Sequence, residues 1–537
     1  MRIRTLPRRA ITLTELLAVI AIIVTLTSMS FFAFSSAKHF TQRQDSDVAS
    51  AIARANVNSQ VQKIAPPKPT VFRTTPLIST TIPRPVGCAK KVNYFNGQPY
   101  FVRFGGLELL QPRPITETLT EGVHFTAAPV VDRAGFEEQH FVGAVVAPEQ
   151  WRTYVPADAF LLHSRKGSKR VIYLDFNGHT VSGTSWNTTF NDGNDIVMKE
   201  WDNDGKAGFS DPEKNMIILM WRYVAEDFAP FDVDVTTEDP GTSALIDEGG
   251  SDDAWGMRVL CGPIPTVSKP TAVAGIDWNK IGGIAGGNFK NTKDQCCFVF
   301  NGSNVGNKNP EWSLPGTVSH EVGHTLGLGH DGDSSKTAPN DEYYPGHTTS
   351  NGIFWGPIMG GVFGSSTKPI VLDQWSAGDY TNANNKQDDL ATITGNSSRL
   401  SYRPDDHHGG DLNTSPTPLN APLTGTLTET YGIIEKNIDV DIFLFYADPG
   451  STDIKVEPFF AGPNLDPKVD LYDPSGNFVT SGTQANGQLA SIFKMTLTTA
   501  GTYQLRISGQ GRTPFGSNYS NYGSLGHYKI TGTVTPL

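Results

Sequence analysis

Apolar and polar residues alternate with a period of two toward the C-terminus. The segments 493–497 and 503–507 each place an apolar residue at every second position, with polar residues between them. Such alternation is typical of half-buried antiparallel strands. Together with the turn sequence Asp473-Pro474-Ser475-Gly476, it predicts an all-β sandwich domain over residues 423–537.

The middle of the chain has a mixed pattern. Three short apolar runs, 171–176, 231–235 and 297–300, predict buried strands. The sequence Ser210-Asp211-Pro212-Glu213 provides a cap, a first-turn proline and an acid at the start of a helix. Apolar residues then follow at helical spacing, namely Ile217, Trp221, Val224 and Phe228. This mixture of strands and helices predicts an α+β (α/β-like) domain over residues 160–405.

Residues 1–40 differ from the rest of the chain. Arginines before residue 10 precede an uncharged stretch, Leu16–Phe34, which at about 1.5 Å per residue crosses most of a bilayer as a helix. The sequence around Glu15 resembles the N-terminus of type IV prepilins and pseudopilins. The resemblance implies cleavage after Ala10, although that family normally has glycine at this position. An ordinary secretory signal predicts cleavage after Ala37 instead. Either way, we expect this segment to engage the membrane or export machinery. The protein is then extracellular or on the cell surface, with residues 11–34 as its anchor if they are retained.

Proline-rich and polar stretches mark the expected boundaries. The Pro- and Thr-rich stretch 65–85 predicts an extended connector, so residues 41–159 are expected to be a connector and prosegment. Residues 406–422 are polar and predict a linker. We therefore expect the two folded domains to be separable, so that a chain ending near Asp411 keeps its catalytic activity.

Length, charge and cysteine content narrow the class of protein. The chain has 537 residues, more than the roughly 250–300 over which one core grows, so several domains are expected. The net charge of -11, without a basic run in the mature chain, argues against nucleic acid as a partner. Four cysteines fit an oxidising compartment, and we favour a disulfide between Cys261 and either Cys296 or Cys297.

Candidate chemistry gathers between residues 318 and 331. His320 and His324 are four residues apart, so on a helix both project from one face toward a single ion, with Glu321 one step around. Gly327 permits the backbone to turn out of the helix and bring His330 to the same ion. Apolar residues spaced by four are expected on the opposite, buried face, namely Val318, Val322 and Leu326.

Three imidazoles leave a fourth coordination position of Zn²⁺ open, which distinguishes a catalytic site from a closed structural one. Glu321 is then placed to take a proton from the attacking water and to deliver it to the leaving amine. The pattern predicts a zinc-dependent endopeptidase that acts on protein or peptide substrates.

The segment 318–331 resembles the extended zinc signature of metzincins, and His330 followed by Asp331 is similar to the adamalysin or reprolysin branch. The resemblance implies a methionine turn beneath the metal, for which Met359 in Gly356-Pro357-Ile358-Met359-Gly360 is the match. The position where some metzincins carry a tyrosine, two residues later, is Gly361, so Tyr380 is given no role. Residues 221–233 and 372–380 also resemble bacterial secreted reprolysin-like peptidases.

The C-terminal strands, with Gly501-Thr502-Tyr503 and the run 522–528, resemble a bacterial pre-peptidase C-terminal domain. Domains of that family accompany secreted peptidases. The resemblance therefore agrees with the expectation of an exported enzyme.

Other candidates are weaker. Asp202-Asn203-Asp204-Gly205 offers oxygen ligands for Ca²⁺ but lacks the glutamate and spacing of an EF-hand loop, so a solvated turn is favoured and calcium has no further support. Cys88 precedes the catalytic region and is a candidate to cap the metal as a thiolate, against a disulfide or an idle thiol. The remaining histidines, such as His347 and His407, lack ligand spacing.

Two other functions compete with the enzyme. One is a non-catalytic surface or pseudopilin-like binding protein that displays a metalloprotease-like domain. The other is a domain that zinc merely stabilises, which requires a fourth protein ligand. All three histidines and Glu321 are present, which favours catalysis.

Overall fold

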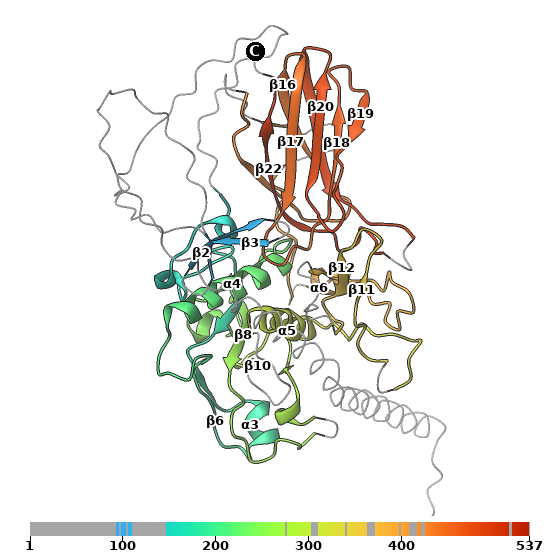
Figure 1. Ribbon diagram of the computed structural model, residues 1–537. Helices are drawn as coiled ribbons and strands as arrows, with labels where there is room; N and C mark the ends of the chain where they lie inside the picture. The colour runs from blue at the N-terminus through green and yellow to red at the C-terminus, as the bar shows by residue number, and fades with distance from the viewer. Residues whose placement is uncertain are drawn as a thin grey trace, which may run out of the picture.

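A computed structural model gives the fold. It describes three short strands, β1 (Asn93–Phe95), β2 (Gln98–Arg103) and β3 (Gly106–Leu109), and then residues 147–535 apart from 274–275, 302–309, 339–340, 362–370, 397–398, 408–415, 420–424 and 515–517. This described part is mostly β-sheet with few helices (Figure 1). None of its helices has the length and apolar character needed to span a membrane. The expected leader or anchor (1–40), most of the expected prosegment and Cys88 lie outside the described residues.

A five-stranded sheet forms the centre of the middle region. Its strand order is β7 (Asp234–Thr236), β4 (Arg170–Asp175), β8 (Trp255–Gly262), β10 (Cys297–Phe300) and β9 (Gly283–Ile284). The first four strands are parallel, and β9 pairs antiparallel with β10 at the edge. Every residue of β8 is buried, as expected for a central parallel strand covered on both faces. The strands predicted from the apolar runs at 171–176 and 297–300 are confirmed, and the third run contributes β7.

Two long helices cover one face of this sheet. α4 (Asp211–Asp227) begins with the predicted cap, because Ser210 and Glu213 form a reciprocal capping box with proline in the first turn. α5 (Pro310–Thr325) lies against α4 (Figure 1). The predicted apolar residues of both helices are buried. They are Ile217, Trp221, Val224 and Phe228 for α4, and Val318, Val322 and Leu326 for α5. Both faces belong to the same core as Ile172 and Val259 of the sheet.

Smaller elements complete the middle region. The opposite face of the sheet packs on a separate apolar cluster that includes Trp186, Trp278 and Phe298. The remaining elements are η1 (Glu149–Trp151), η2 (Pro156–Asp158), β5 (His179–Val181), α3 (Ser185–Phe190), β6 (Ile196–Met198), η3 (Thr242–Ala244), η4 (Trp278–Lys280), β11 (His347–Thr348), β12 (Phe354–Pro357), β13 (Val371–Gln374) and α6 (Asp389–Thr394).

The predicted disulfide is wrong. Cys261, Cys296 and Cys297 are free and buried. Cys261 lies opposite Val299 in the β8–β10 register, and Cys297 lies opposite Val259, so the two thiols are displaced by two residues along neighbouring strands. Cys296 packs in the cluster on the other face of the sheet. Burial raises the pKa of all three thiols, which keeps them protonated and unreactive.

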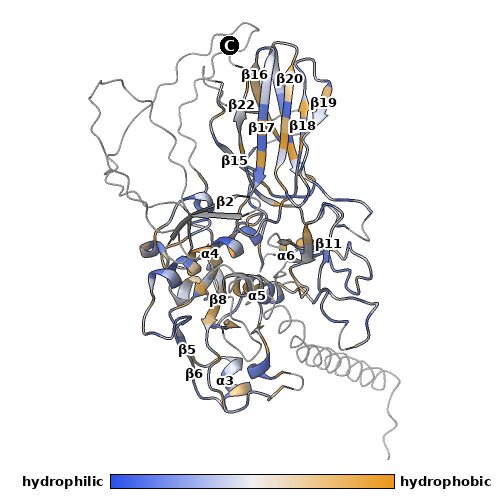
Figure 2. Cartoon of the chain, viewed as in Figure 1, coloured by the Kyte–Doolittle hydropathy of each residue, from blue (hydrophilic) through white to orange (hydrophobic). Residues whose placement is uncertain are grey.

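The C-terminal region is a β-sandwich, as predicted. One sheet has the order β14 (Thr417–Pro418), β16 (Asp441–Ala447), β21 (Gly501–Gly509), β18 (Pro467–Tyr472) and β19 (Phe478–Ser481). The other has the order β15 (Thr430–Ile434), β22 (Gly526–Thr533), β17 (Gly450–Pro458) and β20 (Ser491–Leu497). Apolar and polar positions alternate along these strands, as the colouring of β17 in Figure 2 shows. The inward positions of β21, Tyr503, Leu505 and Ile507, are buried.

The observed boundaries differ from the expected ones. Trp151, which lies in the expected prosegment 41–159, packs on Tyr431 and Phe459 of the sandwich, with ring centroids 5.4 and 5.1 Å away. β14 falls within the expected linker 406–422, yet it pairs with β16 and belongs to the sandwich. Both segments are held by apolar and main-chain contacts that composition alone does not show.

The two folded regions also share one core, whereas the sequence predicted a separate core for each. The apolar cluster that contains residues of α4 and α5 also includes residues of the sandwich, among them Ile434, Leu465 and Leu525. Buried polar contacts cross the same boundary. Glu226 of α4 accepts a hydrogen bond from the backbone N–H of His527 at 2.9 Å and lies 2.6 Å from its Nδ1. Separation of the two regions would expose this apolar surface and break these buried hydrogen bonds.

Candidate metal centre

The structure brings the three predicted histidines together. His320 and His324 lie on α5, and His330 follows the end of that helix. One ligand nitrogen from each lies within 4.8 Å of the others, and the ring centroids are 4.7 to 5.1 Å apart. His320 is buried, whereas His324 and His330 are partly exposed. The cluster is therefore open on one side.

Each imidazole is oriented through its Nδ1 atom. His320 Nδ1 lies 3.0 Å from the carbonyl oxygen of Ile358, and His324 Nδ1 lies 2.9 Å from that of Leu328. His330 Nδ1 lies 2.7 Å from Glu342 Oε1. A proton on each Nδ1 leaves Nε2 as a lone-pair donor, which is the arrangement that metal-binding histidines use.

The Nε2 atoms consequently face one another, and those of His324 and His330 are only 2.9 Å apart. Two neutral acceptor nitrogens at that separation repel unless a proton or a cation lies between them. The donor set of three neutral imidazoles with outer carbonyl and carboxylate partners fits a zinc ion.

The turn after α5 depends on Gly327. The helix ends at Thr325, and Gly327 has φ +94°, a conformation that L side chains rarely adopt. A Cβ at this position would lie 2.3 Å from the guanidinium of Arg399. Gln387 fixes the turn further, because its Oε1 accepts from Gly329 N–H and its Nε2 donates to the Gly327 carbonyl. The chain is thus directed so that His330 returns to the cluster, as the sequence predicted.

Met359 lies directly beneath the helix. It is fully buried, and its sulfur would be 2.5 Å from a Cβ at Gly323, so the glycine lets the two segments approach. The Met359 carbonyl accepts a hydrogen bond from Asp331 N–H at 2.9 Å. The residue before it, Ile358, orients His320. Met359 thus packs against the helix that carries His320 and His324.

Glu321 lies on α5 beside the edge strand of the central sheet. Its side chain is 1% exposed, and a Cβ at Gly283 of β9 would be 2.8 Å from Glu321 Oε1. The glycine therefore leaves the space that this carboxylate occupies. The general base expected from the sequence is adjacent in the helix to His320 and contacts the strand at the sheet edge.

Two residues of the site were missed from the sequence. Glu342 is buried and orients His330, and the Tyr343 hydroxyl lies 3.3 Å from His330 Nε2, with its ring centroid 4.4 Å from that of the histidine. They follow His330 by 12 and 13 residues in a loop without periodic pattern. An acidic residue followed by an aromatic one was the only sequence feature that could have indicated their role, but no fixed spacing links this pair to the histidines.

Asp331 supports the site through its backbone. Its carbonyl accepts from Tyr344 N–H, and neither carboxylate oxygen has a hydrogen-bond partner among the described residues. Burial raises the pKa of Asp331 to about 7, against a lowering by Lys386. Burial and the neighbouring Asp331 also raise the pKa of Asp389. Tyr380, to which no role was given, donates from its hydroxyl to the Gly332 carbonyl and so braces the same turn.

Other acidic groups also come together. Asp202, Asp204 and Glu213 form one cluster, in which Glu213 accepts backbone N–H bonds from Asn203 and Ser210. The structure thus adds Glu213 to the two aspartates of the turn, a carboxylate that the sequence pattern had not linked to them. At the start of the sandwich, burial raises the pKa of Glu435 to about 10 and that of Asp441 to about 11. No sequence pattern had singled out this second group.

Comparisons with known proteins give partial likenesses. No family model matches the chain, and no curated protein matches it. A pre-peptidase C-terminal domain of collagenase from Bacillus anthracis matches 25% of this chain and 99% of its own, with 20% identity and a TM-score of 0.16. That is the family the C-terminal strands resemble in sequence.

Two periplasmic inhibitors of g-type lysozyme match as well. The protein from Aeromonas hydrophila covers 22% of this chain and 96% of its own, with 9% identity and a TM-score of 0.18. The protein from Salmonella Typhimurium covers 22% and 99%, with 20% identity and a TM-score of 0.15. At these scores the likenesses indicate neither substrate nor activity.

Proposed function

We propose that this protein is an exported zinc-dependent endopeptidase of the metzincin kind, similar to the reprolysin branch. The observation that carries the proposal is the convergence of the Nε2 atoms of His320, His324 and His330, each with its Nδ1 held by an oxygen acceptor. Export is proposed from the apolar segment near the N-terminus, Leu16–Phe34.

The three histidines would hold the ion, with Glu342 keeping His330 in the required tautomer. A bound zinc ion supplies Lewis acidity toward a peptide carbonyl and lowers the pKa of water. Glu321, adjacent to His320 on α5, accepts the proton of the attacking water and passes it to the leaving amine. Its burial beside Gly283 limits the space open to the carboxylate, which favours directed proton transfer.

The position of β9 supports an extended peptide as substrate. β9 is the edge strand of the central sheet, and no described strand pairs with its outer side. An extended peptide can add to such an edge through main-chain hydrogen bonds. Because Gly283 in this strand contacts Glu321, a peptide bound there would have its backbone close to the general base.

The test compares the full chain with Glu321→Gln. The variant keeps every proposed ligand and loses the proton acceptor, so zinc content should remain unchanged while hydrolysis of an unstructured protein falls by at least about 100-fold. Glu429→Gln, in the sandwich, serves as a charge-matched control and should retain activity. Chelator should abolish hydrolysis by the parent chain, and added zinc should restore it.

Full turnover by zinc-loaded Glu321→Gln would refute the role of Glu321. A parent chain that binds zinc but cleaves no peptide would instead favour the non-catalytic surface-binding protein.

A further inference from the structure

The loop between β17 and β18 carries a sandwich residue into the region behind the metal centre. Asn464 in this loop is 4% exposed. Its Nδ2 donates to Asp227 Oδ1 at 2.9 Å and to the Asp373 carbonyl at 2.5 Å. The backbone carbonyl of Asn464 accepts from Gln374 Nε2 at 2.6 Å. One sandwich residue thus joins the end of α4 to β13.

The first branch from Asn464 leads to α5. Asp227 Oδ2 accepts a hydrogen bond of 2.5 Å from the hydroxyl of Ser319, which is 0% exposed and precedes His320. The Asp227 carbonyl also accepts from Trp375 Nε1 at 2.9 Å. The carboxylate of Asp227 therefore holds a sandwich amide with one oxygen and the metal-binding helix with the other.

The second branch leads to the other side of the same imidazole. Gln374, which donates to the backbone carbonyl of Asn464, accepts two hydrogen bonds. Its side-chain Oε1 accepts from Trp355 Nε1 at 2.7 Å, and its backbone carbonyl accepts from Ile358 N–H at 2.9 Å. The Ile358 carbonyl lies 3.0 Å from His320 Nδ1. Both branches are buried and both end at His320, one through its helix and one through its ring.

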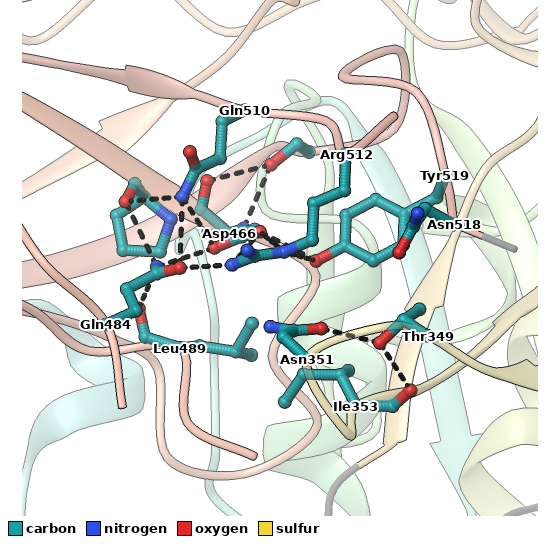
Figure 3. Close-up of polar contacts among 12 residues, drawn as sticks. Thr349, Asn351, Ile353, Asp466, Gln484, Leu489, Gln510, Arg512, Asn518 and Tyr519 are labelled. Atoms are coloured by element: carbon teal, nitrogen blue, oxygen red, sulfur yellow. Dashed lines mark hydrogen bonds and ion pairs between the residues drawn. The ribbon is translucent and has the colours of Figure 1, made fainter. Parts of the chain in front are cut away.

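The loop itself is braced by Asp466, two residues from Asn464 (Figure 3). Asp466 Oδ1 accepts from Gln484 and Gln510, and Oδ2 accepts from Arg512 and from the Tyr519 hydroxyl at 2.6 Å. Asp466 is 0% exposed. A carboxylate with this many donors fixes the loop backbone, so Asn464 is presented in one orientation.

We propose that Asn464 is a positioning residue for the metal centre and that the β-sandwich is thereby an integral part of the catalytic unit. The inference rests on the proposed zinc peptidase function. Loss of the Asn464 side-chain amide removes one hydrogen-bond donor from Asp227 and one from the Asp373 carbonyl. Because water has little access to this region, these groups then move toward new partners. That movement changes the angle of His320 toward the metal.

The experiment replaces zinc with Co²⁺ in the full chain, because the visible spectrum of Co²⁺ depends on ligand geometry. We expect Asn464→Ala to bind Co²⁺ with an altered absorption band and to release it at least about tenfold faster to a chelator, as for other residues that orient ligands. Peptide turnover should fall about 10- to 100-fold in kcat with little change in KM, because misplacement near the chemistry affects the reaction step.

Ser319→Ala tests the branch from Asn464 through Asp227 at its other end. It keeps the inference testable if Asn464→Ala does not fold. Alanine suits the helix, so only the hydroxyl contact to Asp227 is lost. Because both residues bond one carboxylate, the effects of the two substitutions on Co²⁺ release should be clearly non-additive in a double-mutant cycle.

Tyr503→Phe is the matched control. It removes one hydrogen bond inside the sandwich, from the Tyr503 hydroxyl to the Thr499 carbonyl. It should lower the thermal midpoint slightly and leave the Co²⁺ spectrum and kcat unchanged.

An unaltered Co²⁺ spectrum and kcat in folded Asn464→Ala or Ser319→Ala would overturn the inference. Failure of the parent chain to bind Co²⁺ or zinc would refute the proposed function instead.

Discussion

Asp227 joins the sandwich to α5, and its ionisation should control stability between acidic and neutral pH. Burial raises its pKa to about 7, a rise that the nearby Glu226 supports, while hydrogen bonds from Ser319 and Asn464 oppose it. An aspartate in the unfolded chain has a pKa of about 3.9. Between these two values, the folded protein keeps a proton that the unfolded protein has released.

The sign follows from proton linkage. Where the folded state binds more protons than the unfolded state, stability decreases as pH rises. The contribution of Asp227 is thus fully present below about pH 4 and is lost progressively as pH rises through about 7. Three pKa units at about 1.36 kcal/mol each give a loss of about 4 kcal/mol at most.

Asp227→Asn tests this. The amide matches a neutral carboxyl in shape, can accept from Asn464 and can donate to Ser319, and it does not titrate. We expect its stability relative to the parent chain to rise by up to about 3 kcal/mol between pH 4 and pH 7, chiefly above pH 5. Urea unfolding of both metal-free proteins at each pH provides the measurement, because the difference between them cancels the titration of all other groups. A difference that stays constant with pH would refute the reasoning.

Three further outcomes follow from the site and the interface. His330→Ala should retain less zinc after dialysis, since two protein ligands bind more weakly than three, and unchanged stoichiometry would point to another ligand. Glu342→Ala should lower zinc affinity about 10- to 100-fold in chelator competition, because His330 loses its orienting carboxylate; equal affinity would exclude that role. A chain ending near Asp411 should show no cooperative thermal transition, since Glu226 and Asp227 lose buried partners; a parent-like melt would contradict the shared core.

Local patterns predicted local structure well. The Ser210 capping sequence and the spacing of Ile217 and Trp221 gave α4, because a helix and its first turn are determined by neighbours within four residues. The same range covers His320 and His324, and Gly327 ended α5 because only a few dihedral angles turn the chain back. Periodicity of two likewise predicted the sandwich strands.

Long-range partners lie beyond such patterns. The thiols of Cys261 and Cys297 are near in the sheet but out of register, and register depends on how whole strands pack. Glu342 reaches His330 from a loop, where no period fixes the direction of a side chain. Sequence spacing could therefore nominate the ligands but not the groups that orient them.

The interface between the middle region and the sandwich explains why the sequence predicts two independent domains whereas the structure has one continuous core. Glu226 and His527 are 301 residues apart, and each alone resembles an ordinary surface residue in the sequence. Together they satisfy one another with 0% and 1% of their side chains exposed. Removal of one partner would leave the other buried and uncompensated, at a cost of several kcal/mol. A polar boundary of this kind looks like a solvated surface in the sequence, yet its contacts hold the sandwich against α4 and, through Asp227, against the helix that carries His320.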